Sequence, residues 1–168
     1  MKKKTQINIF SENIHEQIKV DEKKAINVAK KLLNYFLDTE NILKNSCLSS
    51  LSFKCISFDI LYCDSSKTHD INKEYRLKDA PADIITFAIF ADSDEKFIFD
   101  GEINLGEIII SLDKVAENAI EKSCTATEEL YFLISHGVMH LLGFDHQTIE
   151  EYNFIVDAQN IALSKIKE

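Results

Sequence analysis

The chain has 168 residues, enough for one domain that buries a hydrophobic core without disulfide bonds. Its 45% hydrophobic and 28% charged residues exclude a disordered chain and are typical of a globular protein. The net charge of −9 at pH 7 argues against a general nucleic-acid coating protein, because such proteins bind phosphates through clustered basic residues. The apolar segments are too short for a membrane span or a signal peptide, so we expect a cytoplasmic protein without a membrane partner.

The N-terminal half predicts two strands and two helices. Thr5 to Phe10 alternates as a strand does, and Asp21 to Leu37 carries apolar residues at helical spacing. Thr39 to Ser50 is predicted as a connecting loop with a short turn. Leu51 to Tyr62 is predicted as the longest strand, and Ser65 to Arg76 as a short helix capped by one of its two initial serines.

Beyond Pro81, the strand-rich part of the chain continues. Ile84 to Phe90 and Ile103 to Ser111 are rich in β-branched and aromatic residues, which predicts two further strands. The acidic stretch between them, Ala91 to Gly101, is predicted as a loop or hairpin connection. Leu112 to Lys122 is predicted as a helix.

Two capping boxes mark the last two helices. Thr125 to Glu128 opens a helix that runs to Leu142, with Gly143 as its stop. Thr148 to Glu151 opens a final helix that reaches about Lys165. Without repeats or linkers, the chain predicts a single α+β domain over residues 1–168. We expect a small mixed sheet of about four strands and about five helices.

The four cysteines form no Cys-x-x-Cys pair. Cys55 and Cys63 lie in the longest predicted strand, where a free cysteine packs as a small hydrophobic residue. We therefore predict free, buried thiols, which suits a reducing compartment.

Three histidines in the segment SHGVMHLLGFDHQ predict a metal site. His136 and His140 are four residues apart in a predicted helix, so their side chains share one face, beside the apolar stripe. Gly143 ends that helix, so the chain can bring His146 back as a third ligand. Three imidazoles leave one position of a tetrahedral Zn²⁺ open, as in catalytic sites, where bound water has its pKa lowered to ~7.

The spacing His-x3-His-x2-Gly-x2-His also matches zincin-type proteases, which we expect the metal-site helix to resemble. In those enzymes the residue after the first histidine is a glutamate that acts as general base. Here that residue is Gly137, which argues against a standard metalloprotease.

The other acidic residues and histidines near these motifs receive weaker predictions. Asp145 is predicted either to orient a ligand imidazole or to cap the following turn, and both alternatives stay open. His15 and His69 lack ligand spacing and are predicted to face solvent. Glu128 and Glu129 are assigned no chemistry.

The segment from His136 to His146, HGVMHLLGFDH, resembles the signature of the YbeY family. Two further blocks are similar to that family: residues 72–87, with Asn72-Lys73-Glu74-Tyr75-Arg76, and residues 105–111, LGEIIIS. The departures from the family pattern include Glu107, Ala82, Thr86 and Ala88. None of them involves the three histidines or Arg76.

The resemblance implies a metal-dependent, single-strand-specific endoribonuclease. Members of the family act in rRNA maturation at the 3′ end of 16S rRNA and in ribosome quality control, so the implied partners are single-stranded RNA and the small ribosomal subunit or its proteins. It implies a function for Arg76, the only arginine among 19 basic residues. A guanidinium binds phosphate through two parallel hydrogen bonds and stabilises charge in a transition state. Lys73 and Lys78 would add positive charge beside it.

The predicted site is therefore one zinc ion on His136, His140 and His146, with Arg76 and the first two histidines in catalytic roles. Two alternatives remain. One is another zinc hydrolase, a peptidase or amidase, on the same three ligands. The other is a non-catalytic ribosome assembly factor with a structural zinc. The sequence leaves the oligomeric state open.

Overall fold

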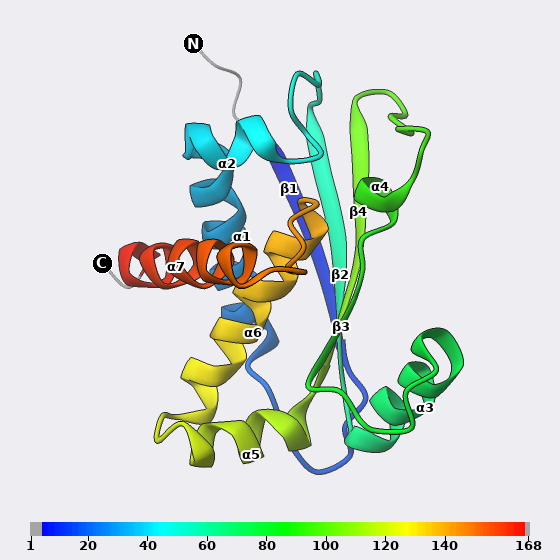
Figure 1. Cartoon of the computed structure of the whole chain (residues 1–168), viewed down its shortest axis with the longest axis vertical. Helices are drawn as coiled ribbons and strands as arrows, with labels where there is room; N and C mark the ends of the chain where they lie inside the picture. The colour runs from blue at the N-terminus through cyan, green and yellow to red at the C-terminus, as the bar shows by residue number, and fades with distance from the viewer. Residues whose placement is uncertain (1–4, 167–168) are drawn as a thin grey trace.

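A mixed four-stranded sheet lies at the centre of the computed structural model, which describes residues 5–166. The strands are β1 (Gln6–Asn13), β2 (Cys55–Cys63), β3 (Ile84–Phe87) and β4 (Glu102–Ser111). Their order is β1-β2-β4-β3, with β1, β2 and β4 parallel and β3 antiparallel to β4 (Figure 1). The predicted α+β class with four strands is confirmed for these residues. The basic start of the chain, residues 1–4, lies outside them.

Helices cover the sheet unequally. Those of the described residues are α1 (Glu22–Asp38), α2 (Glu40–Asn45), α3 (Ser65–Arg76), α4 (Ile89–Asp92), α5 (Leu112–Glu121), α6 (Ala126–Leu141) and α7 (Ile149–Ile166). Figure 1 shows α1, α6 and α7 on one side of the sheet and α3 on the other, while α4, which follows β3, contacts both β4 and α6. The main hydrophobic core lies between the sheet and the first group, and a smaller cluster around Cys63, Ile85 and Ile109 lies on the other face.

Two short helices were not predicted. The segment after Thr39 was expected to be a loop, but it forms α2, whose Ile42 is buried in the core. The strand expected to reach Phe90 ends at Phe87, and the chain turns into α4 so that the Phe90 side chain becomes buried. Lys96 stabilises this turn because its Nζ donates to the carbonyls of Phe90, Ala91 and Ser93 at 2.8, 2.9 and 2.7 Å.

The helix starts agree with the capping residues, with one correction. The Thr125 box with Glu128 is present at α6, and Thr148 exchanges hydrogen bonds with Glu151 at α7. The cap of α3, however, is Asp64 and not one of the serines, because its Oδ1 accepts from the backbone N–H of Lys67 at 2.8 Å.

Helix α6 is the central helix of the core. Its predicted apolar stripe is buried: Leu130, Leu133, Ile134, Val138 and Leu141. Gly137 lies against β4, where a Cβ atom would stand 2.7 Å from Cδ1 of Ile108. The missing side chain therefore lets α6 approach the sheet closely.

No helix within residues 5–166 is both long and apolar enough to cross a membrane. All four cysteines are free, and Cys55 and Cys63 are buried as predicted.

Candidate metal centre and its cleft

The structure brings the three predicted histidines together. His136 and His140 project from one face of α6, and His146 follows the turn after that helix. One ligand nitrogen from each lies within 4.8 Å of the others. The Nε2 atoms of His136 and His140 are 2.9 Å apart. The expected convergence of two helical histidines and a returning third is thus present in the backbone and side-chain geometry.

The turn that returns His146 depends on Gly143. This residue has φ +95°, a left-handed conformation that favours glycine at a helix end. Its N–H donates to the carbonyl of His140 at 2.9 Å. The N–H of Phe144 donates to the carbonyl of Met139 at 3.1 Å. These bonds close the end of α6 and fix the direction in which the following residues leave it.

Asp145 stabilises the same turn. Its Oδ1 accepts from the backbone N–H of His146 at 2.8 Å. That hydrogen bond holds the pKa of the Asp145 carboxyl below its usual value, although burial opposes it. Of the two roles left open by the sequence, the structure shows the turn cap, which places His146 through its backbone.

His136 and His140 are in the form that binds a cation. Burial lowers the pKa of both imidazoles, and for His140 it does so, together with the neighbouring His136 and His146, to about 4. Both rings are therefore neutral at pH 7 and keep an unshared electron pair for a ligand bond. Three imidazole nitrogens at this separation form a donor set that suits one Zn²⁺ ion or a similar transition metal.

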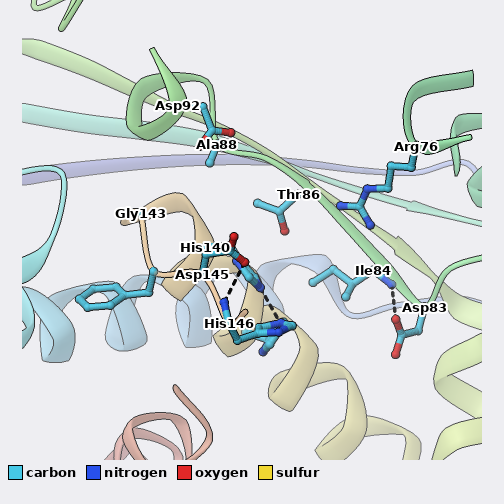
Figure 2. Close-up of a pocket in the computed structure, with 12 residues that line it drawn as sticks. Arg76, Asp83, Ile84, Thr86, Ala88, Asp92, His140, Gly143, Asp145 and His146 are labelled. Atoms are coloured by element: carbon cyan, nitrogen blue, oxygen red, sulfur yellow. Dashed lines mark hydrogen bonds between the residues drawn. The ribbon is translucent and has the colours of Figure 1, made fainter. Parts of the chain in front are cut away.

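The histidines line one wall of a cleft of about 490 Å³. Arg76, at the end of α3, points into this cleft from the opposite side (Figure 2). Thr86 lies between them (Figure 2), Ala88 is also part of the lining, and Asp83, Asp92 and Asp145 contribute carboxylates to it. The predicted phosphate-binding arginine and the predicted ligands therefore share one cleft.

The sequence analysis assigned no role to Asp83, which lines the cleft, or to Gln159, which is buried behind the histidines. Asp83 is held by the N–H of Ile84 at 2.8 Å and by Asn118 Nδ2 at 3.2 Å. Gln159, on α7, lies 3.0 Å from Nδ1 of His136 through its Oε1. The only signal for Gln159 was a polar residue in the otherwise apolar stripe of the last helix, between Ile155 and Ala162.

The remaining residues singled out in the sequence lie away from the cleft lining. Lys73 and Lys78 are exposed, and Lys73 is 3.8 Å from Asp79. His15 was expected to face solvent, which is wrong: it is 8% exposed, its Nε2 is 3.0 Å from Asp113, and its Nδ1 accepts two backbone N–H groups. Glu129 is buried and accepts two hydrogen bonds from Lys122, which is a structural role.

Comparison with known proteins gives one consistent family. The family model described as endoribonuclease YbeY matches residues 10–167. Among curated proteins, endoribonuclease YbeY of Fusobacterium nucleatum is 36% identical over 140 residues, which is 78% of this chain and 85% of the relative. The protein of the same name from a Geobacillus species is 35% identical over 146 residues, covering 85% and 87%.

A solved structure shows the same fold. The solution structure of TM1509 from Thermotoga maritima aligns with a TM-score of 0.56 over 96% of this chain and 92% of that protein. The two sequences are 20% identical, so this likeness concerns the arrangement of helices and strands.

Proposed function

The chain belongs to the YbeY family of endoribonucleases, and from this premise we propose that it hydrolyses phosphodiester bonds of single-stranded RNA with one zinc ion. The observation that carries the proposal is the cleft itself. It holds His136, His140 and His146 as a metal-ligand set on one side and Arg76 on the other.

Each group has a defined task. The three imidazoles hold the ion, and when bound it supplies a Lewis acid that activates water and polarises a phosphate oxygen. Arg76 donates to the non-bridging oxygens of the scissile phosphate and stabilises the charge that develops there. Asp145 keeps His146 in place through the backbone.

The family also suggests the cellular substrate. We propose ribosomal RNA, at the 3′ end of the 16S molecule, with a further role in ribosome quality control in the cytoplasm. An acidic protein, with net charge −9, is suited to contact basic proteins of the small ribosomal subunit.

Two features of the structure count against the rival functions. A peptidase of the zincin type needs a glutamate after the first histidine, but at Gly137 a Cβ would already lie 2.7–3.0 Å from three atoms of Ile108. A structural zinc has four protein ligands in a closed site. Here three histidines face a cleft, and they are the only such ligand group among the described residues.

The test is cleavage of a 5′-labelled single-stranded RNA followed on a denaturing gel. We expect cleavage by the zinc-loaded protein, loss of cleavage after chelation, recovery on adding zinc, and loss of at least about 100-fold in His140→Ala. Asn160→Ala, an exposed change on α7, is the control for the preparation. Cleavage that persists both without metal and in His140→Ala would refute the mechanism. Cleavage of peptides but not RNA would favour the rival hydrolase.

A further inference from the structure

Gln159 is a polar residue in the apolar interface between α7 and the core. It is 0% exposed, and the buried neighbours on its face of α7 are Ile155 and Ala162. A buried amide is costly unless its donors and acceptor are hydrogen-bonded. Gln159 meets this requirement through two residues of α6, Phe132 and His136.

The orientation of this amide is determined by Phe132. The Nε2 of Gln159 donates to the backbone carbonyl of Phe132 at 3.1 Å, and a carbonyl can only accept. The other end of the amide, Oε1, therefore faces Nδ1 of His136 at 3.0 Å. An amide oxygen can only accept, so this contact is a hydrogen bond only when Nδ1 carries the hydrogen.

The hydrogen on Nδ1 has a direct consequence for the other ring nitrogen. A neutral imidazole carries one hydrogen, so Nε2 of His136 has its electron pair free. Nε2 is the atom that lies 2.9 Å from Nε2 of His140, inside the histidine cluster.

We propose that Gln159 is a positioning residue that fixes His136 in the Nδ1–H tautomer and directs its Nε2 electron pair to the metal position. The inference rests on the proposed function for the identity of the bound group, whereas the tautomer itself is a property of the metal-free protein. Gln159 holds the backbone at Phe132 and the side chain at His136, which are four residues apart and so lie one turn apart on α6. One amide thus controls both the position of the helix turn and the direction of the ring.

The first experiment measures the tautomer in metal-free protein by ¹⁵N NMR of the imidazole rings. In the wild type we expect the hydrogen on Nδ1 of His136. In Gln159→Met, which removes the acceptor but keeps the side-chain length, we expect His136 to populate the Nε2–H form. Gln159→Glu keeps an acceptor oxygen and should retain the wild-type tautomer.

The second experiment measures zinc affinity by competition with a chromophoric chelator. Gln159→Met should weaken zinc binding about 10- to 100-fold, the range found when a residue that orients a ligand histidine is lost. Gln159→Glu should retain most of the affinity. Ile155→Val is the matched control, because it loosens the same buried face of α7 without touching His136. It should leave zinc affinity unchanged.

Either measurement can overturn the proposal. A wild-type His136 that carries its hydrogen on Nε2 contradicts it, even if the Gln159 variants fail to fold. An equal loss of zinc affinity in Gln159→Met and Ile155→Val would show that Gln159 acts only through packing. Absence of RNA cleavage would count against the proposed function and leave the tautomer result standing.

Discussion

Arg76 lines the cleft and is positioned by the end of its helix, α3. Leu77, the next residue, has φ +55°, and the N–H of Lys78 donates to the carbonyl of Asn72 at 3.2 Å. The side chain of Asn72 donates to the carbonyl of Ala80 at 2.9 Å, so the loop after Arg76 is hydrogen-bonded to α3. The arginine is exposed, yet the backbone from which it projects is fixed.

We predict that Arg76→Lys lowers the rate of RNA cleavage about 10-fold or more, because an ammonium group cannot make two parallel hydrogen bonds to one phosphate. Zinc affinity should not change, since the residue is no ligand in the proposed site. Single-turnover cleavage assays and chelator competition measure the two quantities. Lys44→Ala, a change of an exposed cation on α2 outside the cleft lining, is the control. An Arg76→Lys protein that cleaves RNA at the wild-type rate would show that two parallel hydrogen bonds from Arg76 are not needed for cleavage.

The spacing of residues in the sequence located some of the side chains at the site and missed others. The three histidines lie within eleven positions, and a helix followed by a glycine is enough to bring them together. Gln159 and Asp83 reach the site from other elements, and local spacing carries no signal for such contacts. His15 was misjudged for the same reason, because its partner Asp113 is 98 positions away.

The contact between α6 and β4 is the element-scale feature on which the ligand geometry depends. At Gly137 a Cβ atom would lie 2.7, 2.8 and 3.0 Å from three side-chain atoms of Ile108. A β-branched residue on a central strand has little rotamer freedom to move aside. An added methyl group must therefore push the helix away from the sheet.

We predict that Gly137→Ala lowers the free energy of unfolding by up to roughly 2 kcal/mol, since overpacking that costs about 1–3 kcal/mol is offset only in part by a helix propensity gain of about 1 kcal/mol. Combining it with Ile108→Val should cost less than the sum of the two single changes, because valine lacks the Cδ1 atom of the closest contact. Urea denaturation of the four proteins measures this. Strict additivity, or a more stable Gly137→Ala, would contradict the packing argument.

Elements with a chemical start or stop signal were predicted well. The capping box at Thr125 and the glycine at 143 bracket α6, and the observed helix agrees within a residue at each end. The segment from Ile84 to Phe90 was predicted as one strand because its residues favour strands throughout. Its change to helix after Phe87 follows from tertiary packing of Phe90 and the three carbonyl bonds of Lys96.

For the whole molecule, charge sets the conditions under which RNA can bind. The protein carries −9, and the cleft is lined by three aspartates, Asp83, Asp92 and Asp145, against Arg76 alone. A polyanion is repelled by such a surface. The positive charge of a divalent ion on the histidines would offset this excess where the phosphate must lie.

We predict that RNA binding itself, and not only cleavage, requires the metal. Fluorescence anisotropy with a 2′-O-methyl oligonucleotide, its integrity checked on a gel, should show affinity at least about 10-fold weaker without zinc, since oppositely charged groups dominate RNA binding. Asp92→Asn should strengthen metal-free binding, whereas Asp157→Asn, an exposed change on α7 outside the cleft lining, should not. Equal affinities with and without zinc would show that the cleft charge does not control binding.

The contact of α7 with the histidine cluster bears on how the site could be moved or shortened. The segment from His136 to His146 contains every proposed ligand, yet one of these rings is oriented by a residue of the last helix. Grafting that segment onto another scaffold would therefore transfer the ligands without the support that orients them. In the same way, a protease cut between α6 and α7 that released the last helix would leave the histidines in the chain and dismantle their arrangement.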